Sequence, residues 1–414
     1  YHGLLVGSLN PPVDRVMSLA CCLEMMISGS DVLNLSTFEF SDRFSPESFK
    51  YLKTFRKNAG VHFDYETPKA NLTKSVYILN ETNTVGIVYD FKKVFEPFDF
   101  VFRPFVGLRD FHSLQKSYAP LKAVDFKHGL LIRHDVRDSC ELFLNCPDAK
   151  FEHDPQWWFN FVYRRDKWRG QDYKEDLASE GFYRVSIDSP RRVVFWATLA
   201  NSGEISEEKI NLNFDIDSVR SDITKRQKSL IAKAKAKNRD MVRLALAADQ
   251  MVIYCPSKKN CRTTILACYP WFADWGRDAF ISLPGLLLET GRFEEAKSVL
   301  TYFANSCEKG VIPNRFDDRG DTAYFNTVDA SLWFIDASFK YFKYSGDEEG
   351  FSFQLLPVIR NIVDCYQKGT MFNIHSDTDG LITAGDADTQ LTWMDAKFDN
   401  VVFTPRYGKA VEIN

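Results

Sequence analysis

The chain has 414 residues, 45% of them hydrophobic and 26% charged, which is typical of a soluble globular protein with about two to three domains. The formal net charge of −4 argues against a general attraction to nucleic acid or to anionic membranes. Since no run of roughly 18 apolar residues is present, no transmembrane helix is predicted.

Residues 1–215 show the pattern of short strands separated by turns. Apolar residues alternate with polar ones at 76–78 and again at 85–91, and a turn at 81–84 separates the two runs, which predicts a hairpin. Further strand-like runs lie at 129–133, 159–164, 182–187 and 192–199. The abundance of Phe, 35 residues, favours a Phe-rich core over sugar-binding platforms. We therefore predict an N-terminal antiparallel β-sandwich domain.

Residues 216–250 are rich in strong helix formers and predict a linker helix region. Its Lys and Arg residues between Lys225 and Arg243 suit a solvated helix, or less often a polyanion-binding one. Residues 251–414 carry three apolar stripes at helical spacing, at 296–307, at 328–342 and at 355–366. The second stripe consists of Val328, Leu332, Ile335, Phe339 and Phe342. Glycines follow each stripe, so we expect successive helices with short loops, as in a helical bundle or an α/α toroid.

Nine cysteines are scattered along the chain, an odd number that indicates free thiols in a reducing compartment and hence a cytoplasmic protein. None forms a Cys-x-x-Cys pair, and the histidines lack metal-ligand spacing, so we expect neither a metal nor another cofactor. No signal segment opens the chain. Residue 1 is Tyr rather than Met, so we expect the true N-terminus to be missing or processed.

The segment from Tyr269 to Asp278 holds the densest cluster of polar and aromatic side chains, namely Trp271, Asp274, Trp275, Arg277 and Asp278. A Trp face can pack against a pyranose ring, while a guanidinium fork and a carboxylate can bind paired hydroxyl groups. The cluster therefore predicts a sugar site. The alternative is a helix-capping Asp with an Arg–Asp ion pair packed on tryptophan.

A second cluster runs from Gln390 to Ala396 and contains Thr392, Trp393 and Asp395. Asp395 follows the apolar Trp393 and Met394, and an apolar surround suits a carboxyl that must act as a general acid near neutral pH. By composition alone, an aspartate at a helix start is the more frequent reading.

Three further groups carry weaker signals. Asn326 and Asp329 open the second helical stripe, where Asp329 shares a face with Trp333, so they form either a substrate-facing rim or a dipole-favoured helix start. The tail offers three more candidates, Arg406, Lys409 and Glu412. The segment 375–380 has part of the oxygen spacing of a calcium loop but lacks the later ligands, so we interpret it as a turn.

Several strings resemble the amylo-α-1,6-glucosidase (glycogen debranching) family in its prokaryote-type form. The string from Trp275 to Gly285 resembles the opening signature of the catalytic domain, and the strings 390–397 and 404–414 resemble later ones. The shorter strings 1–6, 109–112 and 173–177 are similar to the family's N-terminal domain. The resemblance runs in order along the whole chain.

The resemblance implies an all-α (α/α)₆ toroid, only partly present over residues 251–414, behind a β-sandwich. It implies a glycoside hydrolase that removes α-1,6-linked glucose from branch stubs of glycogen or limit dextrin with inversion. Arg277 and Asp278 match the pair that binds the terminal glucose, and Asp395 matches the general acid. The remaining candidates, Glu412 included, then become substrate-binding residues.

The resemblance also implies that this chain is truncated at its C-terminus, and at its N-terminus by about the first strand. The general base would lie on a late toroid helix beyond Asn414, so the chain alone is expected to lack it. There is no room for an upstream 4-α-glucanotransferase domain. Two alternatives stay open: another exo-acting glycosidase of the same toroid clan, such as a glucoamylase or trehalase, and a non-catalytic glycan-binding fragment.

Overall fold

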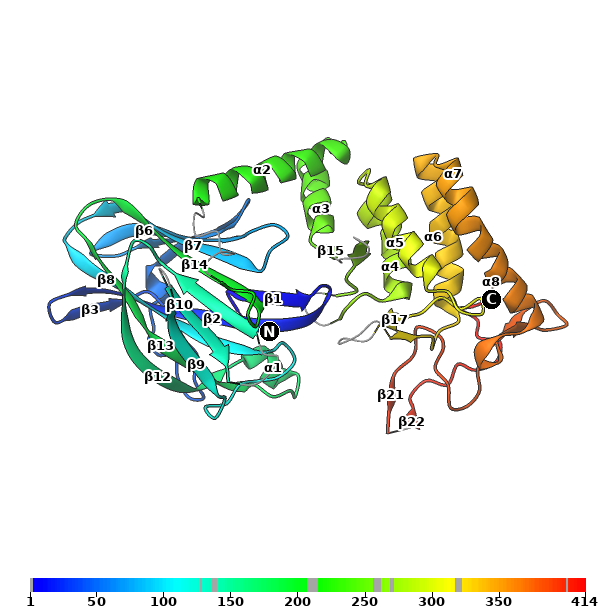
Figure 1. Cartoon of the computed structure of the whole chain (residues 1–414), viewed down its shortest axis with the longest axis horizontal. Helices are drawn as coiled ribbons and strands as arrows, with labels where there is room; N and C mark the ends of the chain where they lie inside the picture. Colours follow the sequence, from blue (N-terminus) through cyan, green and yellow to red (C-terminus); the bar gives the residue numbers. More distant parts are fainter. Residues whose placement is uncertain are drawn as a thin grey trace. The chain divides into compact units, whose positions relative to one another are not determined.

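The computed structural model describes residues 3–126, 129–135, 140–206, 215–255, 262–268, 272–316, 322–399 and 401–414. The chain divides into two compact units, one of Tyr1–Leu9 with Asp14–Arg226 and one of Asn10–Val13 with Gln227–Asn414. Figure 1 shows strands throughout the first unit and mainly helices in the second. The division falls inside α2 (Ile216–Lys233), within the segment that the sequence predicts as a linker.

Two sheets build the first unit. One has the order β1-β2-β8-β13-β12, with β3 paired to β2, from β1 (Leu5–Asn10), β2 (Val13–Ser28), β3 (Asp31–Asn34), β8 (Phe98–Asp110), β12 (Lys150–Val162) and β13 (Lys174–Ile187). The other has the order β4-β5-β6-β7-β14-β11-β10-β9, from β4 (Leu52–Lys57), β5 (Val61–Glu66), β6 (Ala70–Ile78), β7 (Thr84–Val94), β9 (Leu121–Phe126), β10 (Gly129–His134), β11 (Cys140–Asn145) and β14 (Arg191–Asn201). The pairs are antiparallel throughout the second sheet and wherever β8 meets β2 or β13. A 3₁₀ turn η1 (Phe49–Tyr51) and a short helix α1 (Arg164–Trp168) complete the unit.

The alternating pattern predicts these strands correctly. β6 and β7 form the predicted hairpin, in which Val76 pairs with Ile87 and Ile78 with Val85. The runs 129–133, 182–187 and 192–199 lie in β10, β13 and β14. The run 159–164 is wrong at its end, because β12 stops at Val162 and the chain turns into α1 at Arg164.

The two sheets enclose a Phe-rich core, as predicted. The rings of Phe102 and Tyr183 stack at 5.0 Å between centroids, and Phe195 of the other sheet meets Phe102 at 5.1 Å. All three are buried, and full burial of such a side chain contributes about 1.5–3 kcal/mol. Interdigitation of rings from both sheets makes this unit a β-sandwich.

Two of the N-terminal strings meet in space. Arg109 at the end of β8 pairs with Glu175 at the start of β13, and both side chains are buried. The backbone N–H of Gln115 donates to Glu175 at 3.0 Å, and the Tyr163 hydroxyl donates to the same carboxylate. This buried charge pair therefore links β8 to β13, and Gln115 and Tyr163 satisfy further acceptor positions of the Glu175 carboxylate.

Helices dominate the second unit. These are the end of α2, then α3 (Arg239–Asp249), α4 (Gly276–Leu283), α5 (Phe293–Asn305), α6 (Asp329–Ser345), α7 (Glu348–Gly350) and α8 (Leu356–Lys368), with π-helical turns η2 (Pro284–Leu288) and η3 (Phe351–Leu355) and a 3₁₀ turn η4 (Met371–Asn373). Short strand pairs join them: β15 (Val252–Cys255) with β16 (Arg262–Ile265), β17 (Arg315–Phe316) with β18 (Ala323–Tyr324), β19 (His375–Ser376) with β20 (Ile382–Thr383), and β21 (Lys397–Phe398) with β22 (Val401–Val402).

The three predicted stripes correspond to α5, α6 and α8, which share one hydrophobic cluster. α6 ends at Gly346 in the left-handed conformation, at φ 69°, as the predicted glycine stop requires. The buried face of α6 differs from the prediction, since Phe334 and Tyr341 are buried while Phe339 is 47% exposed. Small residues Ala330 and Ala337 lie on the buried face, and they allow close packing against α4.

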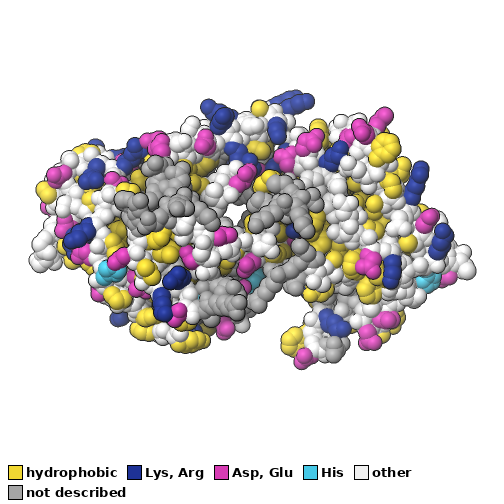
Figure 2. Space-filling model, in the orientation of Figure 1, with side chains coloured by type: hydrophobic (Ala, Val, Ile, Leu, Met, Phe, Trp, Pro, Cys, Tyr) yellow, Lys and Arg dark blue, Asp and Glu magenta, His cyan; other side chains and the backbone are white. Residues whose placement is uncertain are grey.

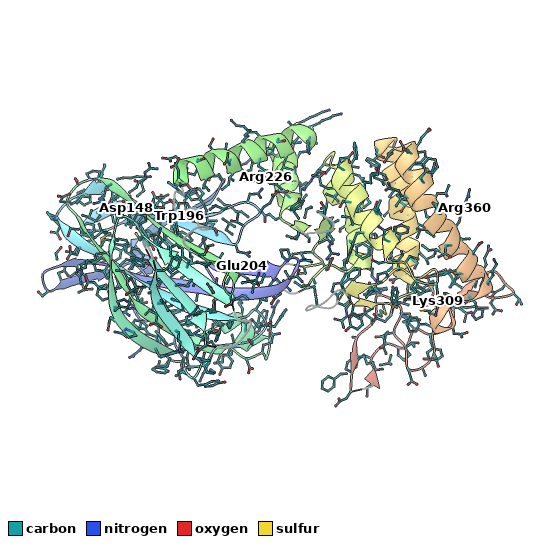
Figure 3. The ribbon with its side chains drawn as sticks, in the orientation of Figure 1. Asp148, Trp196, Glu204, Arg226, Lys309 and Arg360 are labelled. Atoms are coloured by element: carbon teal, nitrogen blue, oxygen red, sulfur yellow. The ribbon has the colours of Figure 1, made fainter. Side chains whose placement is uncertain are left out.

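The first turns of α2 pack on the sandwich, whereas most Lys and Arg side chains between Lys225 and Arg243 are exposed, as a solvated helix requires. Ile216, Val219 and Ile223 pack with Trp196 on the sandwich, where Figure 3 labels Trp196. Figure 2 shows Lys and Arg interspersed with Asp and Glu over the face in view. None of the described helices is long and apolar enough to cross a membrane.

Candidate active site

The first turn of α4 holds the centre of the predicted sugar site. Trp275 precedes the helix in an extended conformation, and the N–H of Gly276 donates to the carbonyl of Asn314 at 2.7 Å. A Cβ on residue 276 would lie 2.5 Å from the carbonyl oxygen of Pro313, so only glycine permits this approach. This close backbone contact fixes the start of α4, where Arg277 and Asp278 lie.

Arg277 forms a buried fork with Asp329, the first residue of α6. Its Nε and Nη2 atoms donate to the two carboxylate oxygens at 2.6 and 3.0 Å. The hydroxyl of Thr327 donates to the same carboxylate at 2.8 Å. Only 9% of the Arg277 side chain and 8% of the Asp329 side chain are exposed. Burial by itself lowers the pKa of Arg277, but its bonds to Asp329 and Asp395 outweigh burial and hold that pKa above its usual value.

Asp395 is brought to the same guanidinium from 118 residues away. Arg277 Nη1 donates to Asp395 Oδ2 at 3.3 Å, and the Asp395 side chain is 27% exposed. Asp395 lies in a loop rather than at a helix start. The loop is fixed because the N–H of Val328, at the start of α6, donates to the carbonyl of Leu391 at 2.8 Å, and Thr392 is buried.

The apolar surround predicted for Asp395 is only partly formed. Trp393 is 57% exposed, so it cannot enclose the neighbouring carboxyl. Met394 turns its sulfur toward Arg406, whose Nε lies 3.3 Å from it. Neighbours in sequence therefore contribute less to the setting of Asp395 than Arg277 does.

Asp278 is the carboxyl of this group whose pKa is displaced upward. Burial, which disfavours the charged form, is the main cause of the raised pKa of Asp278. The Arg277 cation opposes that rise, and the nearby carboxylates of Asp395 and Asp329 add to it. Arg277 thus contacts the carboxyl groups of Asp329 and Asp395, and the carboxyl of Asp278 follows directly at the same helix start.

The other candidates have different surroundings. Asp274 is buried and accepts a bond from the Thr264 hydroxyl at 2.9 Å, which holds it in the packing beneath α4. Asn326 is exposed, and Trp333 is 38% exposed on α6. Trp271 lies outside the described residues. Trp275 is half-buried and meets the ring of Phe272 edge-on at 5.6 Å.

The three tail candidates are ion-paired. Arg406 Nε lies 3.4 Å from Glu412 Oε1. Lys409 Nζ lies 2.7 Å from both Asp377 and Asp379, and it is the main cause of their lowered pKa values. The segment 375–380 is the predicted turn between β19 and β20 and holds a lysine between its carboxylates. Among the residues that the structure describes, no group of three or more His, Cys, Asp or Glu side chains is placed to hold a metal ion.

The sequence does not predict two residues that contact Arg277 and Asp329. Asn314 is fully buried, and its Oδ1 lies 3.4 Å from the backbone nitrogen of Arg277. Thr327 orients Asp329 and also accepts from the N–H of Ala330 at 3.1 Å. Neither is charged or aromatic, and neither falls on a periodic stripe, so only the tertiary fold reveals them.

Comparison with known proteins gives two family matches. The amylo-alpha-1,6-glucosidase model matches residues 246–414, and the model of the glycogen debranching enzyme N-terminal region matches residues 1–194. A glycogen debranching enzyme of Saccharomyces cerevisiae is 31% identical in an alignment of 194 residues, and the match covers 34% of this chain and 13% of that enzyme.

Comparison with solved structures gives one likeness of fold and one weaker match. A bacterial glucoamylase in complex with acarbose matches with a TM-score of 0.52 at 12% identity, over 89% of this chain and 56% of the glucoamylase. A family GH92 alpha-mannosidase from Bacteroides thetaiotaomicron matches with a TM-score of 0.35 at 8% identity, over 88% of this chain and 59% of its own. The chain thus spans little more than half of the glucoamylase and a small part of the yeast enzyme.

Proposed function

Because the chain belongs to the glycogen debranching enzyme family, we propose that the protein hydrolyses α-1,6-linked glucose at branch stubs of glycogen or limit dextrin, with inversion. A branched α-glucan is then its partner, and the cytoplasm, where its free thiols stay reduced, its compartment. The fold likeness to a glucoamylase supports placing the helices of the second unit in an (α/α)₆ toroid behind the sandwich.

The observation that carries this proposal is the contact of Arg277 with both Asp329 and Asp395. An arginine held by a buried fork keeps one Nη free to meet Asp395, which lies far away in sequence. Asp278 follows Arg277 directly at the helix start. A terminal glucose needs donors and acceptors that converge from fixed elements, and this group provides both.

In the proposed reaction, Arg277 and Asp278 hold the hydroxyl groups of the terminal glucose. Asp395 donates a proton to the glycosidic oxygen as the bond to the polymer breaks. A second carboxylate, which we propose lies beyond Asn414, activates from about 6.5–9.5 Å the water that attacks the opposite face of the sugar. Since Asp329 is committed to Arg277, we assign it to positioning rather than to the role of base.

The remaining candidates are proposed to line the substrate path. Trp275, Trp333 and Trp393 are partly or largely exposed, so each offers an aromatic face to further sugar rings. Trp271, Asn326, Thr392, Arg406, Lys409 and Glu412 complete the proposed set. Asp274 would act from beneath α4, through the helix start that it supports.

The test is an assay of a purified chain that includes the proposed base, on panose-like α-1,6 stubs, maltose and trehalose, with the anomer of the first product followed by NMR. We expect β-glucose from the α-1,6 stub and slower release from the others. Asp395→Asn should retain glycogen binding while hydrolysis falls by about two to four orders of magnitude, the scale of general acid catalysis. Preference for maltose or trehalose would favour a different glycosidase of the clan. Glycogen binding without glucose release would favour a non-catalytic role.

A further inference from the structure

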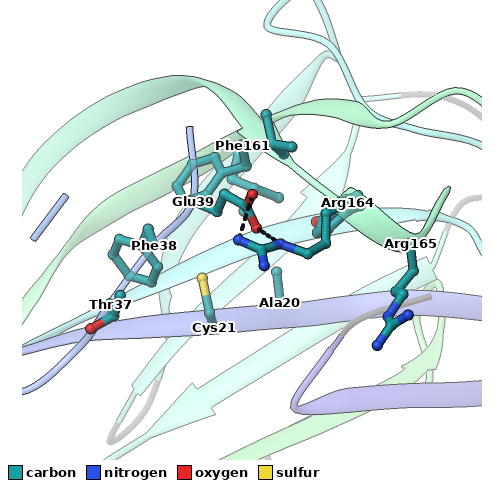
Figure 4. A pocket seen from close by; sticks show the side chains of 11 residues that line it. Ala20, Cys21, Thr37, Phe38, Glu39, Phe161, Arg164 and Arg165 are labelled. Carbon is teal, nitrogen blue, oxygen red and sulfur yellow. Dashed lines mark hydrogen bonds and ion pairs between the residues drawn. The ribbon is translucent and has the colours of Figure 1, made fainter. Parts of the chain in front are cut away.

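The sandwich unit carries a pocket of its own. The pocket has a volume of about 240 Å³, and Figure 4 shows it from close by. Cys21 of β2 lies on its floor, Phe38 and Phe161 form walls, and Glu39 and Arg164 lie across from each other. None of these side chains belongs to the group around Arg277.

The pocket lies on the face of the first sheet that points away from the sandwich core. Ala20 and Leu177 belong to a separate cluster with Phe38 and Phe161, whereas Leu19 of the same strand β2 points into the main core. Phe38 meets Phe161 edge-on at 5.4 Å, and the N–H of Val162 donates to the carbonyl of Glu39 at 2.9 Å. These contacts fix the wall, so the pocket exists before any ligand arrives.

The rim of the pocket carries a charged pair, and exposed aromatic rings lie near its arginines. Arg164 donates through Nε and Nη2 to the two oxygens of Glu39, at 2.8 and 2.9 Å, and the Arg164 side chain is 60% exposed. Arg165, which also lines the pocket, lies 5.9 Å from the ring of Trp168 on α1. Trp168 is 79% exposed, and Phe44, under the Arg164 guanidinium at 5.3 Å, is 42% exposed.

This combination favours a neutral, polyhydroxylated ring over an anion. Aromatic and aliphatic walls can pack against the C–H face of a sugar, while a carboxylate and a guanidinium can bind its hydroxyl groups as acceptor and donor. An inorganic anion would meet the Glu39 carboxylate in the lining and would gain nothing from the apolar floor. The volume is below the range of about 300–1,000 Å³ of drug-sized sites, and it suits one ring.

We propose that this pocket, together with the exposed Trp168 of the helix α1 that supplies Arg164 and Arg165, binds one glucose unit of an α-glucan chain as a second, non-catalytic site. The choice of an α-glucan over other sugars rests on the proposed function. The site would hold the polymer by the sandwich unit while the second unit acts on a chain end.

The test compares two variants of the site with two matched controls in the full chain. Trp168→Ala removes the exposed ring and Arg164→Gln removes the fork. Phe55→Ala removes a ring that is 57% exposed, and Arg56→Gln breaks the fork to Asp64, at 2.8 and 2.8 Å. Affinity is measured by retardation in glycogen-containing native gels and by calorimetry with maltotetraose.

Each site variant should weaken glycogen binding by about tenfold, the effect of losing one stacked ring or one charged hydrogen bond, and the controls should bind normally. Hydrolysis of a short α-1,6 stub should stay unchanged in all four. If the protein hydrolyses stubs but Trp168→Ala binds glycogen like the wild type, the second site is wrong and the proposed function stands. If the protein hydrolyses no substrate but Trp168→Ala binds glycogen more weakly than the wild type, the proposed function is wrong and the second site stands.

Two further readouts keep the test decisive. Thermal unfolding of each variant shows whether its fold is intact, and Trp168 is so exposed that its replacement should leave unfolding unchanged. Inorganic phosphate is added as a competitor. Displacement of maltotetraose by phosphate, relieved in Arg164→Gln, would identify an anion site and overturn the proposal.

Discussion

Arg277 owes its position to Asp329 more than to any other residue. Both side chains are at least nine-tenths buried, and a buried guanidinium without its partner retains an uncompensated charge. The same fork leaves Nη1 directed at Asp395. Asp329 therefore has a structural task and, in the proposed reaction, positions Arg277 toward Asp395.

Replacement of Asp329 by Ala should destabilise the second unit by about 3–5 kcal/mol, the usual cost of breaking a buried ion pair. Urea unfolding measures this change. The matched control is Asp336→Ala on the same helix, where Asp336 pairs with Lys340 at 2.7 Å and both side chains are more than two-fifths exposed. That loss should stay below about 1 kcal/mol. Equal losses in the two variants would contradict the positioning role of Asp329.

Asp278 illustrates why the protonation of this group was not evident from residue types. The sequence assigns the apolar surround to Asp395, whereas the structure partly buries Asp278 near the carboxyl groups of Asp395 and Asp329. Its raised pKa means that Asp278 takes up a proton more readily in the folded chain than in the unfolded chain. Its contribution to stability is present at acidic pH and is lost as the pH rises through the folded pKa.

At the scale of elements, Asp347 joins three helices. It caps α7 by accepting from the N–H of Gly350 at 2.9 Å, accepts from the Tyr341 hydroxyl of α6 at 2.7 Å, and pairs with Lys297 of α5 at 2.8 Å. Lys297 is the main cause that lowers the pKa of Asp347 to about 2, with Tyr341 and the cap next. One side chain thus fixes how the turn at Gly346 returns the chain toward α5.

This junction should make stability depend on acid pH. Because the folded pKa of Asp347 is lowered, its contribution is complete above its unfolded pKa of about 3.9 and is lost as the pH falls through about 2. Asp347→Ala should remove that loss and cost about 1 kcal/mol for the cap at neutral pH. Asp347→Ser should restore the cap but not the pH dependence. Thermal melts between pH 2 and pH 7 test both, and an unchanged acid slope in Asp347→Ala would refute the assignment.

Elements were more predictable than the contacts between them. Alternation at 76–91 predicts the hairpin because its signal is local, and the stops at Gly346 and Gly369 follow from glycine chemistry. The apolar stripe predicts the wrong buried face for α6. Ala330 and Ala337 carry weak hydrophobic signals, yet they permit close helix packing on the face that is buried. Short-range patterns specify an element, whereas its rotation depends on its neighbours.

The site shows the same limit at longer range. Arg277 and Asp395 meet across 118 residues, and no periodicity links a helix start with an irregular loop, so only the resemblance to a family suggested their meeting. Asn314 and Thr327 support the group through amide and hydroxyl bonds. Such residues are common in turns, and nothing in the sequence distinguishes them.

For the whole molecule, the two units have separate hydrophobic cores that share no residue. Phe195 lies in the sandwich core and Phe303 lies between Phe280 and Phe316 in the helical core, and both are fully buried. A Phe→Ala change in such a setting costs about 3–5 kcal/mol through lost burial and a residual cavity. Each substitution should therefore act on its own unit.

Scanning calorimetry should resolve two unfolding transitions. Phe195→Ala should lower only the transition of the sandwich, and Phe303→Ala only that of the helical unit, each by roughly 10 °C for units of this size. Since the residues around Arg277 all lie in the second unit, loss of glycan hydrolysis on heating should follow the transition that Phe303→Ala lowers. A single transition lowered equally by both substitutions would show that the two cores unfold as one cooperative structure, because each then depends on the other for its stability.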